Sequence, residues 1–519
     1  MTSWPRYQTG LSTKCPRSIE WSTTSPRSLR PPSNGSSFTM RNTGRHPSDR
    51  SGIFSLFEPD SVAVVGSMRE ARFGGYQTVK HLLDFGFPGK IYPVNPNYDT
   101  VLGMKVYPSL NDIADSIDLV VMMTAASAVP GIIRDCVAKK VKTAIIVADG
   151  FAERDEEGAR LQRQVDSIAR AGHLRVLGPN TIGVVNSANG LITTPYRVPY
   201  EQVFRGGIAI CSQTGLLGPQ TLPLFEMRYP LSKICDFGNK CDINELDLLE
   251  YLAGDPQTTV IAMHLEEVRD GRSFLRKLKE TVPEKPVLIL KPGRTTESRK
   301  AMTSHTGSLA GEDYVYDGAF RQAGAIRVDS FRELVDIPKI LAWQPLPPGN
   351  RLAVVTISGG AGVLGIDTAV QQGLTLAHLS RSTLDRLSDI SPVLAGNPID
   401  LGPGLPAFMK RGDMASHLYG ILETLVNDDN VDCISVACPW MLRGALTEVF
   451  GPLRSTSVKP IAFWVPSPSL TRAHEISLNL EALGFPAYPD CDSSVRALAI
   501  AYKYSVARSR VRRSEVQAR

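Results

Sequence analysis

A histidine flanked by small hydroxyl residues is the first candidate for chemistry in this chain. It lies in Ser304-His305-Thr306-Gly307-Ser308, within the run AMTSHTGSLAGEDYVYDGAFRQAG and directly before a helix-like stretch. Small neighbours leave the imidazole accessible, and they allow backbone N–H groups to approach an anion closely. The alternative is a capped helix start with an incidental histidine.

Two further turns combine glycine with hydroxyl side chains. Ser212-Gln213-Thr214-Gly215 follows a predicted strand at 207–211, and the sequence predicts that it opens a helix. Ser358-Gly359-Gly360-Ala361-Gly362 repeats the pattern after the strand in RLAVVTIS. Free N–H groups and the helix dipole attract anions at such positions, so both turns are predicted phosphate-binding sites. A plain N-cap is the alternative for each.

These turns must be positioned by regular elements, and strands alternate with helices from residue 52 to 185. Buried strands are predicted at SVAVVG (61–66), GKIYPVNP (89–96), DLVVMMT (118–124), TAIIVAD (143–149) and LRVLGPN (174–180), with helices between them. Repeated strand–helix units predict a parallel, doubly wound α/β sheet. The same strand–turn–helix pattern recurs in the remainder of the chain.

Ligands of such sheets bind beyond the carboxyl ends of the strands. Three segments are predicted at that edge: the turn from Gly66 to Gly74-Gly75, the tripeptide Val94-Asn95-Pro96, and the turn Gly178-Pro179-Asn180-Thr181. The first is not a regular G-x-G-x-x-G motif, and each segment alone could be ordinary turn chemistry. Their joint placement predicts a nucleotide-like ligand.

Composition narrows the class of protein. The 519 residues leave room for about three domains, and 42% hydrophobic with 21% charged residues is typical of a globular protein. No apolar run approaches the ~18 residues that span a bilayer. The eight cysteines show no C-x-x-C pair, which argues against a zinc site and a disulfide framework. The sequence therefore predicts a cytoplasmic protein without a membrane span or a bound metal.

The formal net charge of +5 comes from one end of the chain. Residues 1–50 hold eight Lys or Arg against two acids, a surplus larger than that of the whole chain, so the remainder is slightly acidic. This removes the main reason to expect a nucleic-acid partner. The segment is rich in Ser, Arg and Pro without apolar periodicity, and we predict a disordered basic tail. Whether residues 1–39 belong to the mature protein stays open, because Met40 could be the start.

Several motifs together resemble a known family. VAVVG, GGYQTVKHLLDFGFPGKIYPVNPNYDTVLGMKVYPSL, DGFAE and GPNTIG resemble the CoA-binding domain of succinyl-CoA synthetase-like enzymes. The closer resemblance is to the NDP-forming acyl-CoA synthetases, also called ADP-forming acetate–CoA ligases, and it covers about residues 52–505. The family usually has Gly-Ala-Ser after the first strand, where this chain has Gly66-Ser67-Met68 at the same spacing.

The resemblance implies a domain order. A Rossmann-like CoA-binding domain is expected over residues 51–185, and a succinyl-CoA synthetase-like flavodoxin domain over 186–345. A second flavodoxin-like ligase domain is expected over 346–510, with tails at 1–50 and 511–519.

The resemblance also implies site residues. His305 matches the phosphohistidine, and Glu266, at the end of the predicted strand TVIAMHLE, matches the glutamate that orients it. A carboxylate that accepts one ring N–H fixes the tautomer and leaves the other nitrogen nucleophilic. The turns 212–215 and 358–362 would hold the phosphoryl group. The implied CoA-binding residues are Gly66, Ser67, Met68, Gly75, Val94, Asn95, Pro96 and Asn180.

The implied activity is that of the α subunit of an ADP-forming acyl-CoA synthetase. Acyl-CoA, phosphate and ADP would be converted to carboxylic acid, CoA and ATP through an acyl phosphate and a phosphohistidine. We expect Mg²⁺ and nucleotide on a separate ATP-grasp β subunit of a hetero-oligomer, because three α/β domains fill the chain and no Walker A motif occurs. The acyl group, the choice between ADP and GDP, and the stoichiometry stay open.

Two alternatives come from other classes of protein. One is a non-catalytic CoA- or acyl-CoA-binding regulatory module, in which the histidine is commonly replaced, whereas His305 is present here. The other is a nucleotide-binding oxidoreductase, but a single dinucleotide fold does not account for the two later phosphate turns.

Overall fold

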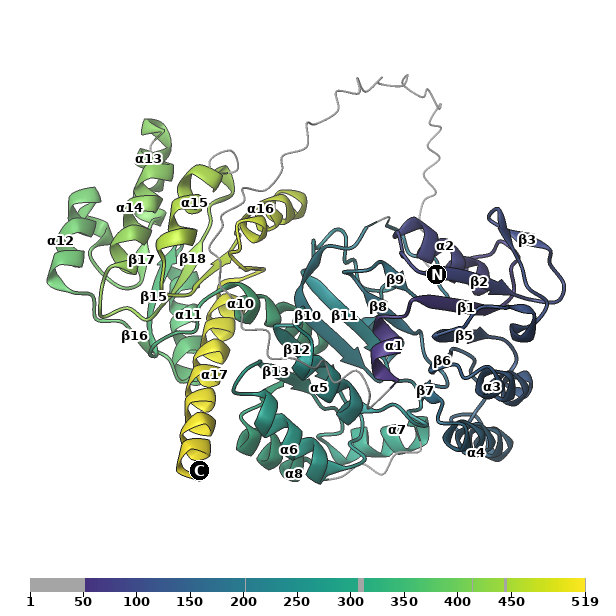
Figure 1. Ribbon diagram of the computed structural model, residues 1–519. Coiled ribbons are helices and arrows are strands. Elements are labelled where there is room, and N and C mark those ends of the chain that lie inside the picture. The colour runs from purple at the N-terminus through teal and green to yellow at the C-terminus, as the bar shows by residue number, and fades with distance from the viewer. Residues whose placement is uncertain (1–51, 201, 307–311, 413, 443–445, 519) are drawn as a thin grey trace, which may run out of the picture. The chain divides into compact units, whose positions relative to one another are not determined.

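The computed structural model describes residues 52–200, 202–306, 312–412, 414–442 and 446–518 (Figure 1). The expected basic tail at 1–50 lies outside these residues. Within them the chain forms three main sheets, each built largely from parallel strands. The α/β class predicted from the alternating pattern is therefore confirmed.

The first sheet has five parallel strands in the order β2-β1-β5-β6-β7. Residues alternate between its two faces: Val62 and Val64 share a core with helix α2, whereas Ala63 packs with α3 and α4 on the opposite face. Figure 1 shows these helices on opposite sides of the sheet. The elements are β1 (Ser61–Gly66), α2 (Gly75–Asp84), β2 (Lys90–Val94), β5 (Leu119–Met123), α3 (Val129–Ala138), β6 (Thr143–Ile146), α4 (Glu156–Ala171) and β7 (Arg175–Leu177).

The order in which strands are added to this sheet reverses at β1, although all five strands are parallel. The connection from β1 leads to β2 on one side, and the next strand, β5, pairs with β1 on the other side. This switch point opens a crevice at the carboxyl ends of the strands. Beyond the end of β2 lies the hairpin β3 (Thr100–Val101) with β4 (Met104–Lys105), whereas the short helix α1 (Ile53–Phe57) lies near the amino end of β6, where Thr143 Oγ1 donates to the carbonyl of Gly52.

The second sheet has the order β14-β13-β12-β10-β11-β8-β9. Its last two strands form an antiparallel hairpin on the parallel strand β11. The strands are β8 (Val184–Asn186), β9 (Leu191–Ile192), β10 (Arg205–Ser212), β11 (Leu231–Asp236), β12 (Val260–His264), β13 (Val287–Leu290) and β14 (Ile326–Val328). The helices are α5 (Glu245–Gly254), α6 (Gly271–Thr281), α7 (Thr296–Thr306), α8 (Asp313–Ala323), α9 (Phe331–Asp336) and α10 (Pro338–Trp343).

The helix predicted to begin at Ser212–Gly215 is wrong. Only a three-residue 3-10 turn, Gly215–Leu217, follows β10, and the chain then runs through successive turns to β11. Pro219 and Pro223 explain the difference, because each lacks an N–H and its ring clashes with the carbonyl four residues earlier in a helix. The carbonyl of Pro219 instead accepts a hydrogen bond from Tyr200 Oη at 2.6 Å. This turn therefore lacks the dipole of a helix.

The third sheet has the order β16-β15-β18-β19-β20, with β17 paired to the carboxyl end of β15. Its strands are β15 (Arg351–Thr356), β16 (Thr375–Leu376), β17 (Ile399–Asp400), β18 (Cys433–Ala437), β19 (Ile461–Trp464) and β20 (Ala487–Tyr488). Its helices are α11 (Gly359–Gln372), α12 (Arg381–Ile390), α13 (Leu405–Arg411), α14 (Met414–Val426), α15 (Leu446–Thr456) and α16 (Leu470–Ala482).

The last helix, α17 (Cys491–Ala518), joins the third sheet to the second. Tyr504 Oη donates to the carbonyl of Val282 at 2.7 Å, and Arg508 Nε donates to that of Pro283 at 2.7 Å. A tail was expected from residue 511, but helical backbone continues to Ala518.

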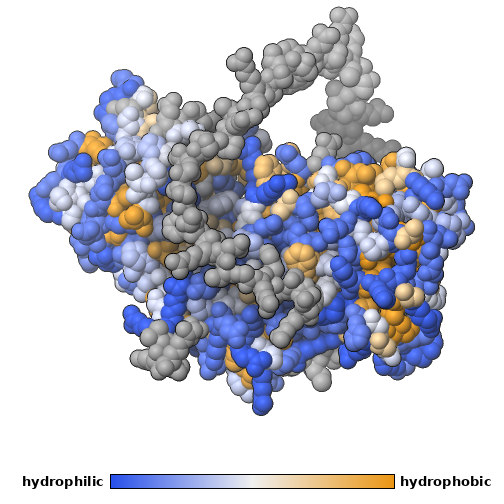
Figure 2. Space-filling view, viewed as in Figure 1, coloured by the Kyte–Doolittle hydropathy of each residue, from blue (hydrophilic) through white to orange (hydrophobic). Residues whose placement is uncertain are grey.

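The face of the molecule in Figure 2 is largely hydrophilic, with apolar residues gathered in several patches. Among the described residues, no helix combines the length and the apolar character needed to cross a membrane.

Candidate functional site

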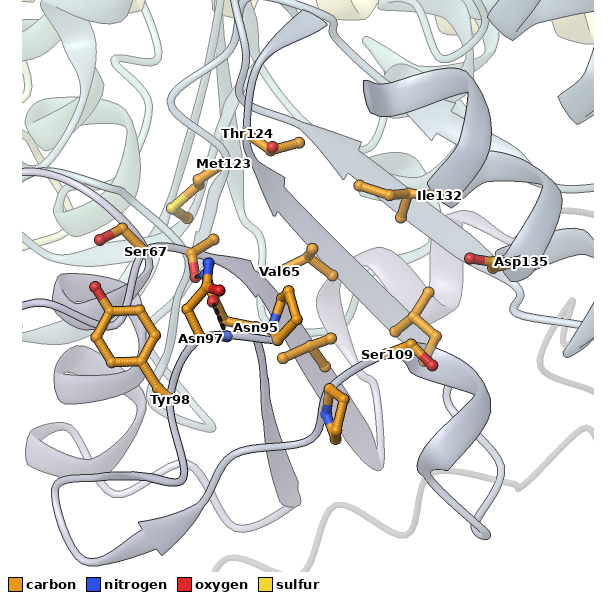
Figure 3. Close-up of a pocket in the computed structure, with 15 residues that line it drawn as sticks. Val65, Ser67, Asn95, Asn97, Tyr98, Ser109, Met123, Thr124, Ile132 and Asp135 are labelled. Carbon is orange, nitrogen blue, oxygen red and sulfur yellow. Dashed lines mark hydrogen bonds between the residues drawn. The ribbon is translucent and has the colours of Figure 1, made fainter. Parts of the chain in front are cut away.

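A cavity of about 530 Å³ opens at the carboxyl ends of β1, β2 and β5 (Figure 3). This volume falls within the ~300–1,000 Å³ of typical small-molecule sites. The lining residues come from the three strand ends, the loop after β2 and helix α3: Val65, Gly66, Ser67, Val94, Asn95, Pro96, Asn97, Tyr98, Pro108, Ser109, Leu110, Met123, Thr124, Ile132 and Asp135. The cavity therefore occupies the switch point of the first sheet.

Asn95 fixes the floor of this cavity. Its Nδ2 donates to the carbonyl of Gly66 at 2.8 Å, and its Oδ1 accepts from the N–H of Asn97 at 2.9 Å. The side chain thus ties the end of β1 to the loop after β2 (Figure 3). Gly75 acts behind the cavity, because a Cβ there would lie 3.1 Å from the carbonyl oxygen of Ser67. A side chain at this position would require the helix or the strand end to shift by a few tenths of an ångström.

Five of the predicted CoA-binding residues line the cavity: Gly66, Ser67, Val94, Asn95 and Pro96. Met68 does not, because its apolar side chain turns into the core and is 4% exposed. Gly75 supports the cavity without lining it. Sequence reasoning missed Tyr98, Thr124 and Asp135. Thr124 is the last residue of a predicted strand, so the rule that ligands bind at strand ends could have found it.

Asn180 lies at a different place, where the first sheet meets the second. The turn Gly178–Asn180 packs against the turn Phe237–Lys240 that follows β11. The N–H of Asn239 donates to the carbonyl of Pro179 at 2.8 Å, and that of Cys241 donates to Gly178 at 2.9 Å. The carboxyl edges of the two sheets are therefore joined through their backbones.

Glu153 extends this junction. Its Oε1 accepts the N–H groups of Gly150 and Phe151 at 2.6 and 3.0 Å, and its Oε2 accepts from the side-chain amide of Asn239. The segment DGFAE after β6 is thus bound to the second sheet as well.

Glu266 lies at the carboxyl edge of the second sheet, but not within a strand. Strand β12 ends at His264, two residues before the predicted end, and Glu266 begins the following loop. Gln213 places this loop: its Oε1 accepts the N–H of Glu266 at 2.6 Å and that of Glu267 at 3.1 Å. The turn after β10 and the loop after β12 are therefore held together by a single side-chain amide.

Ser212 and Thr214 satisfy local backbone groups in this turn. Ser212 Oγ accepts the N–H of Thr214 at 3.0 Å and lies 3.3 Å from His264 Nδ1. Thr214 Oγ1 accepts the N–H of Leu216 at 3.3 Å. Thr214 thus caps the three-residue 3-10 turn, and Ser212 forms a local hydrogen bond within the strand end.

A buried carboxyl group, that of Asp236, lies at the same edge of the second sheet. Asp236 ends β11, and burial raises its pKa to about 6, although N–H groups of Ile182 and Gly238 oppose the rise. The negative charge of Glu266 adds to the increase. Asp236 and Glu266 therefore lie within electrostatic range of each other.

His305 lies in the last turn of α7, but its side chain, with Gly307 and Ser308, falls outside the described residues. The turn Ser358–Gly362 starts α11 on the third sheet as predicted, and Ser358, Gly359 and Gly360 are exposed there. Its free N–H groups open a helix of 14 residues. The predicted residues thus come from three different sheet edges.

Comparisons with known proteins agree with this architecture. The family model described as "CoA binding domain" matches residues 60–187, and that of the "Succinyl-CoA ligase like flavodoxin domain" matches residues 205–341. They confirm the predicted order of these two domains.

Curated relatives extend over most of the chain. Acetate–CoA ligase [ADP-forming] II of Archaeoglobus fulgidus is 37% identical over 87% of this chain and 66% of its own length. Acetate–CoA ligase [ADP-forming] I subunit alpha of Pyrococcus furiosus is 33% identical over 87% of this chain and 97% of its own. The chain thus spans slightly less than two thirds of the first relative and nearly all of the second.

A solved structure shares the fold. It is the Ca. Korarchaeum cryptofilum dinucleotide forming acetyl-coenzyme A synthetase 1 in complex with phosphate and ADP. It superimposes with a TM-score of 0.80 at 31% identity, over 89% of this chain and 98% of that one. The names of these relatives support the ligase prediction rather than a regulatory module. The chain belongs to the family of ADP-forming acetate–CoA ligases.

Proposed function

We propose that the chain is the α-type subunit of an ADP-forming acyl-CoA synthetase. It interconverts acyl-CoA, phosphate and ADP with carboxylic acid, CoA and ATP. The observation that carries the proposal is that the carboxyl edges of the first two sheets are joined. The first edge holds the cavity at the switch point, and the second holds Glu266 near the buried Asp236. The match to nearly the full length of an α subunit supports it.

The first step takes place at the cavity of the first sheet. A phosphate oxygen attacks the thioester carbonyl carbon, the C–S bond breaks, and the CoA thiolate leaves with the electron pair and takes up a proton. Gly66, Ser67 and Asn95 hold the nucleotide end of CoA through backbone and amide groups. The product is an acyl phosphate.

The second step takes place at the second sheet. A ring nitrogen of His305 attacks phosphorus, the P–O bond to the acyl group breaks, and the carboxylate leaves. Glu266 accepts the N–H of the other ring nitrogen, which fixes the tautomer and stabilises the positive ring. The turns 212–215 and 358–362 hold the phosphoryl oxygens. In the first turn the N–H groups of Gln213 and Thr214 are bonded within the protein, so it offers the N–H of Gly215, and it does so without a helix dipole.

The phosphoryl group then passes to ADP on a partner chain. We infer an ATP-grasp β subunit that supplies the nucleotide and Mg²⁺, and a hetero-oligomer in the cytoplasm. The "subunit alpha" in the name of the Pyrococcus relative supports a partner.

Labelled phosphate tests the proposal. Wild-type chain incubated with acetyl-CoA and ³²P-phosphate should acquire acid-labile, base-stable label, and His305→Ala should acquire none. Label that survives the substitution would refute the role of His305. Glu266→Gln should slow labelling while the affinity for CoA, measured by calorimetry, stays unchanged.

A second experiment tests the partner. The purified chain should make no ATP from acetyl-CoA, phosphate and ADP, and addition of an ATP-grasp subunit should restore synthesis. ATP synthesis by the chain alone would contradict the inference of a separate subunit.

A further inference from the structure

Lys291 is a buried lysine at the carboxyl edge of the second sheet. It follows β13 directly and is 2% exposed. Its Nζ donates to the carbonyl of Pro292 at 2.9 Å and lies 4.6 Å from the ring centre of Tyr316. Within the described part of the chain, no carboxylate forms an ion pair with this ammonium.

The neighbouring cations differ from it. Arg327 on β14 forms a two-pronged ion pair with Asp313, and Lys240 after β11 contacts Glu245 at 2.9 Å. A buried charge without a partner is costly, so proteins usually pair it or remove it. Lys291 therefore differs from these two cations at the same edge, both of which are paired with carboxylates.

The backbone places Lys291 beside the loop that begins at Glu266. Leu290 pairs with His264 across β13 and β12, and the N–H of Leu265 donates to the carbonyl of Leu290 at 3.0 Å. Continuing this register places Lys291 level with Leu265, one residue before Glu266. Glu266 and Asp313 are the acids in its electrostatic range, and Arg327 and Lys240 are the other cations.

Lys291 remains largely charged near neutral pH. Burial, with the charge of Arg327, lowers its pKa to about 8, while Asp313 and Glu266 oppose the decrease. Below that value the ammonium supplies a positive potential in a site of low polarity, where charges act over longer distances than in water.

We propose that Lys291 is a positioning residue that keeps the carboxylate of Glu266 ionised, so that it can accept the ring N–H of His305. The inference rests on the proposed function. Glu266 lies near Asp236 and must retain its charge while a phosphoryl dianion arrives, and both negative charges favour protonation of a carboxyl. A fixed, unneutralised cation on the adjacent strand end opposes that protonation.

The test follows the carboxyl group itself. Protein labelled with [¹³Cδ]glutamate is titrated by NMR, and Glu266→Gln identifies the resonance of Glu266. In Lys291→Met we expect the midpoint of this titration to rise by about one pH unit, the lower end of the effect of a nearby opposite charge. Lys291→Arg should restore the wild-type midpoint, because arginine stays charged.

Lys285→Met is the matched control. Lys285 precedes the same strand at its amino end, and its Nζ donates to the carbonyls of Leu252 and Asp255. This substitution removes a half-buried lysine far along the strand from Glu266, and the titration should not move. The acid limb of ³²P labelling should shift in Lys291→Met by the same amount as the NMR midpoint.

Stability separates this role from a structural one. Because burial lowers the pKa of Lys291 to about 8, keeping this lysine charged in the folded state below that pH costs stability. Lys291→Met removes this cost and should melt at the same or a higher temperature. An unchanged Glu266 titration in Lys291→Met, or a melting temperature well below that of the wild type, overturns the proposal. Absence of ³²P label in the wild type would refute the proposed function instead, and the NMR titration would still decide the inference.

Discussion

Gln213→Leu should loosen the loop that carries Glu266. The glutamine Oε1 accepts two backbone N–H groups, those of Glu266 and Glu267, at 2.6 and 3.1 Å. A hydrogen bond contributes about 1 kcal/mol net, so loss of both destabilises the closed loop by about 2 kcal/mol. This corresponds to a roughly 30-fold increase in the population of opened loop.

Amide hydrogen exchange measures this opening directly. A peptide that covers the loop after β12 should exchange roughly 30-fold faster in Gln213→Leu, while peptides from the first sheet stay unchanged. Gln202→Leu is the control. Gln202 is exposed and lies outside this loop, and the substitution changes the side chain in the same way. Gln213→Glu keeps an acceptor for both N–H groups and should keep their protection, although it adds a charge beside Glu266. Unchanged exchange in Gln213→Leu would refute the assignment of Gln213 as the residue that places Glu266.

Three further predictions concern the carboxyl edges of the first and second sheets. Gly75→Val should weaken CoA binding at least tenfold by calorimetry, because a Cβ meets the strand end at 3.1 Å, while Gly131→Ala, where a Cβ meets nothing within 4 Å, should bind normally. Asn95→Ala should also weaken CoA binding, by up to about 30-fold for the ~2 kcal/mol of its two lost hydrogen bonds, and wild-type affinity would contradict its role in the floor of the cavity. Burial raises the pKa of Asp236 to about 6, so the contribution of this residue to stability should fall as pH rises from about 4 to 6. The melting temperature of Asp236→Asn should therefore rise relative to that of the wild type over this interval, and a constant difference would count against the raised pKa.

Much of the fold could be predicted from the sequence because parallel strands buried on both faces are continuous apolar runs. Three of the predicted strands are strands in the structure: SVAVVG, LVVMM and TAII. The cavity lies at the predicted strand ends, beside Gly66 and Asn95. These features depend on local composition and on a general rule of sheet topology.

The errors have local causes that act over a few residues. A glycine-hydroxyl turn suggested a helix after β10, but Pro219 and Pro223 prevent one. Met68 was assigned to the ligand by its position in a motif, whereas its apolar side chain gains more from the core. The role of Gln213 and the unpaired charge of Lys291 depend on contacts between strands far apart in the chain, which no single segment reveals.

In the proposed function, the backbone hydrogen bonds between the turns at Gly178–Asn180 and Phe237–Lys240 affect the fate of the acyl phosphate intermediate. Because they hold the two carboxyl edges together, an acyl phosphate formed at the first edge searches a small, fixed volume before it meets the second. Its effective concentration is then set by the fold and not by the amount of enzyme in solution. Transfer should therefore compete well with hydrolysis at any dilution, and a nucleophilic scavenger added to the solvent should intercept little of the intermediate.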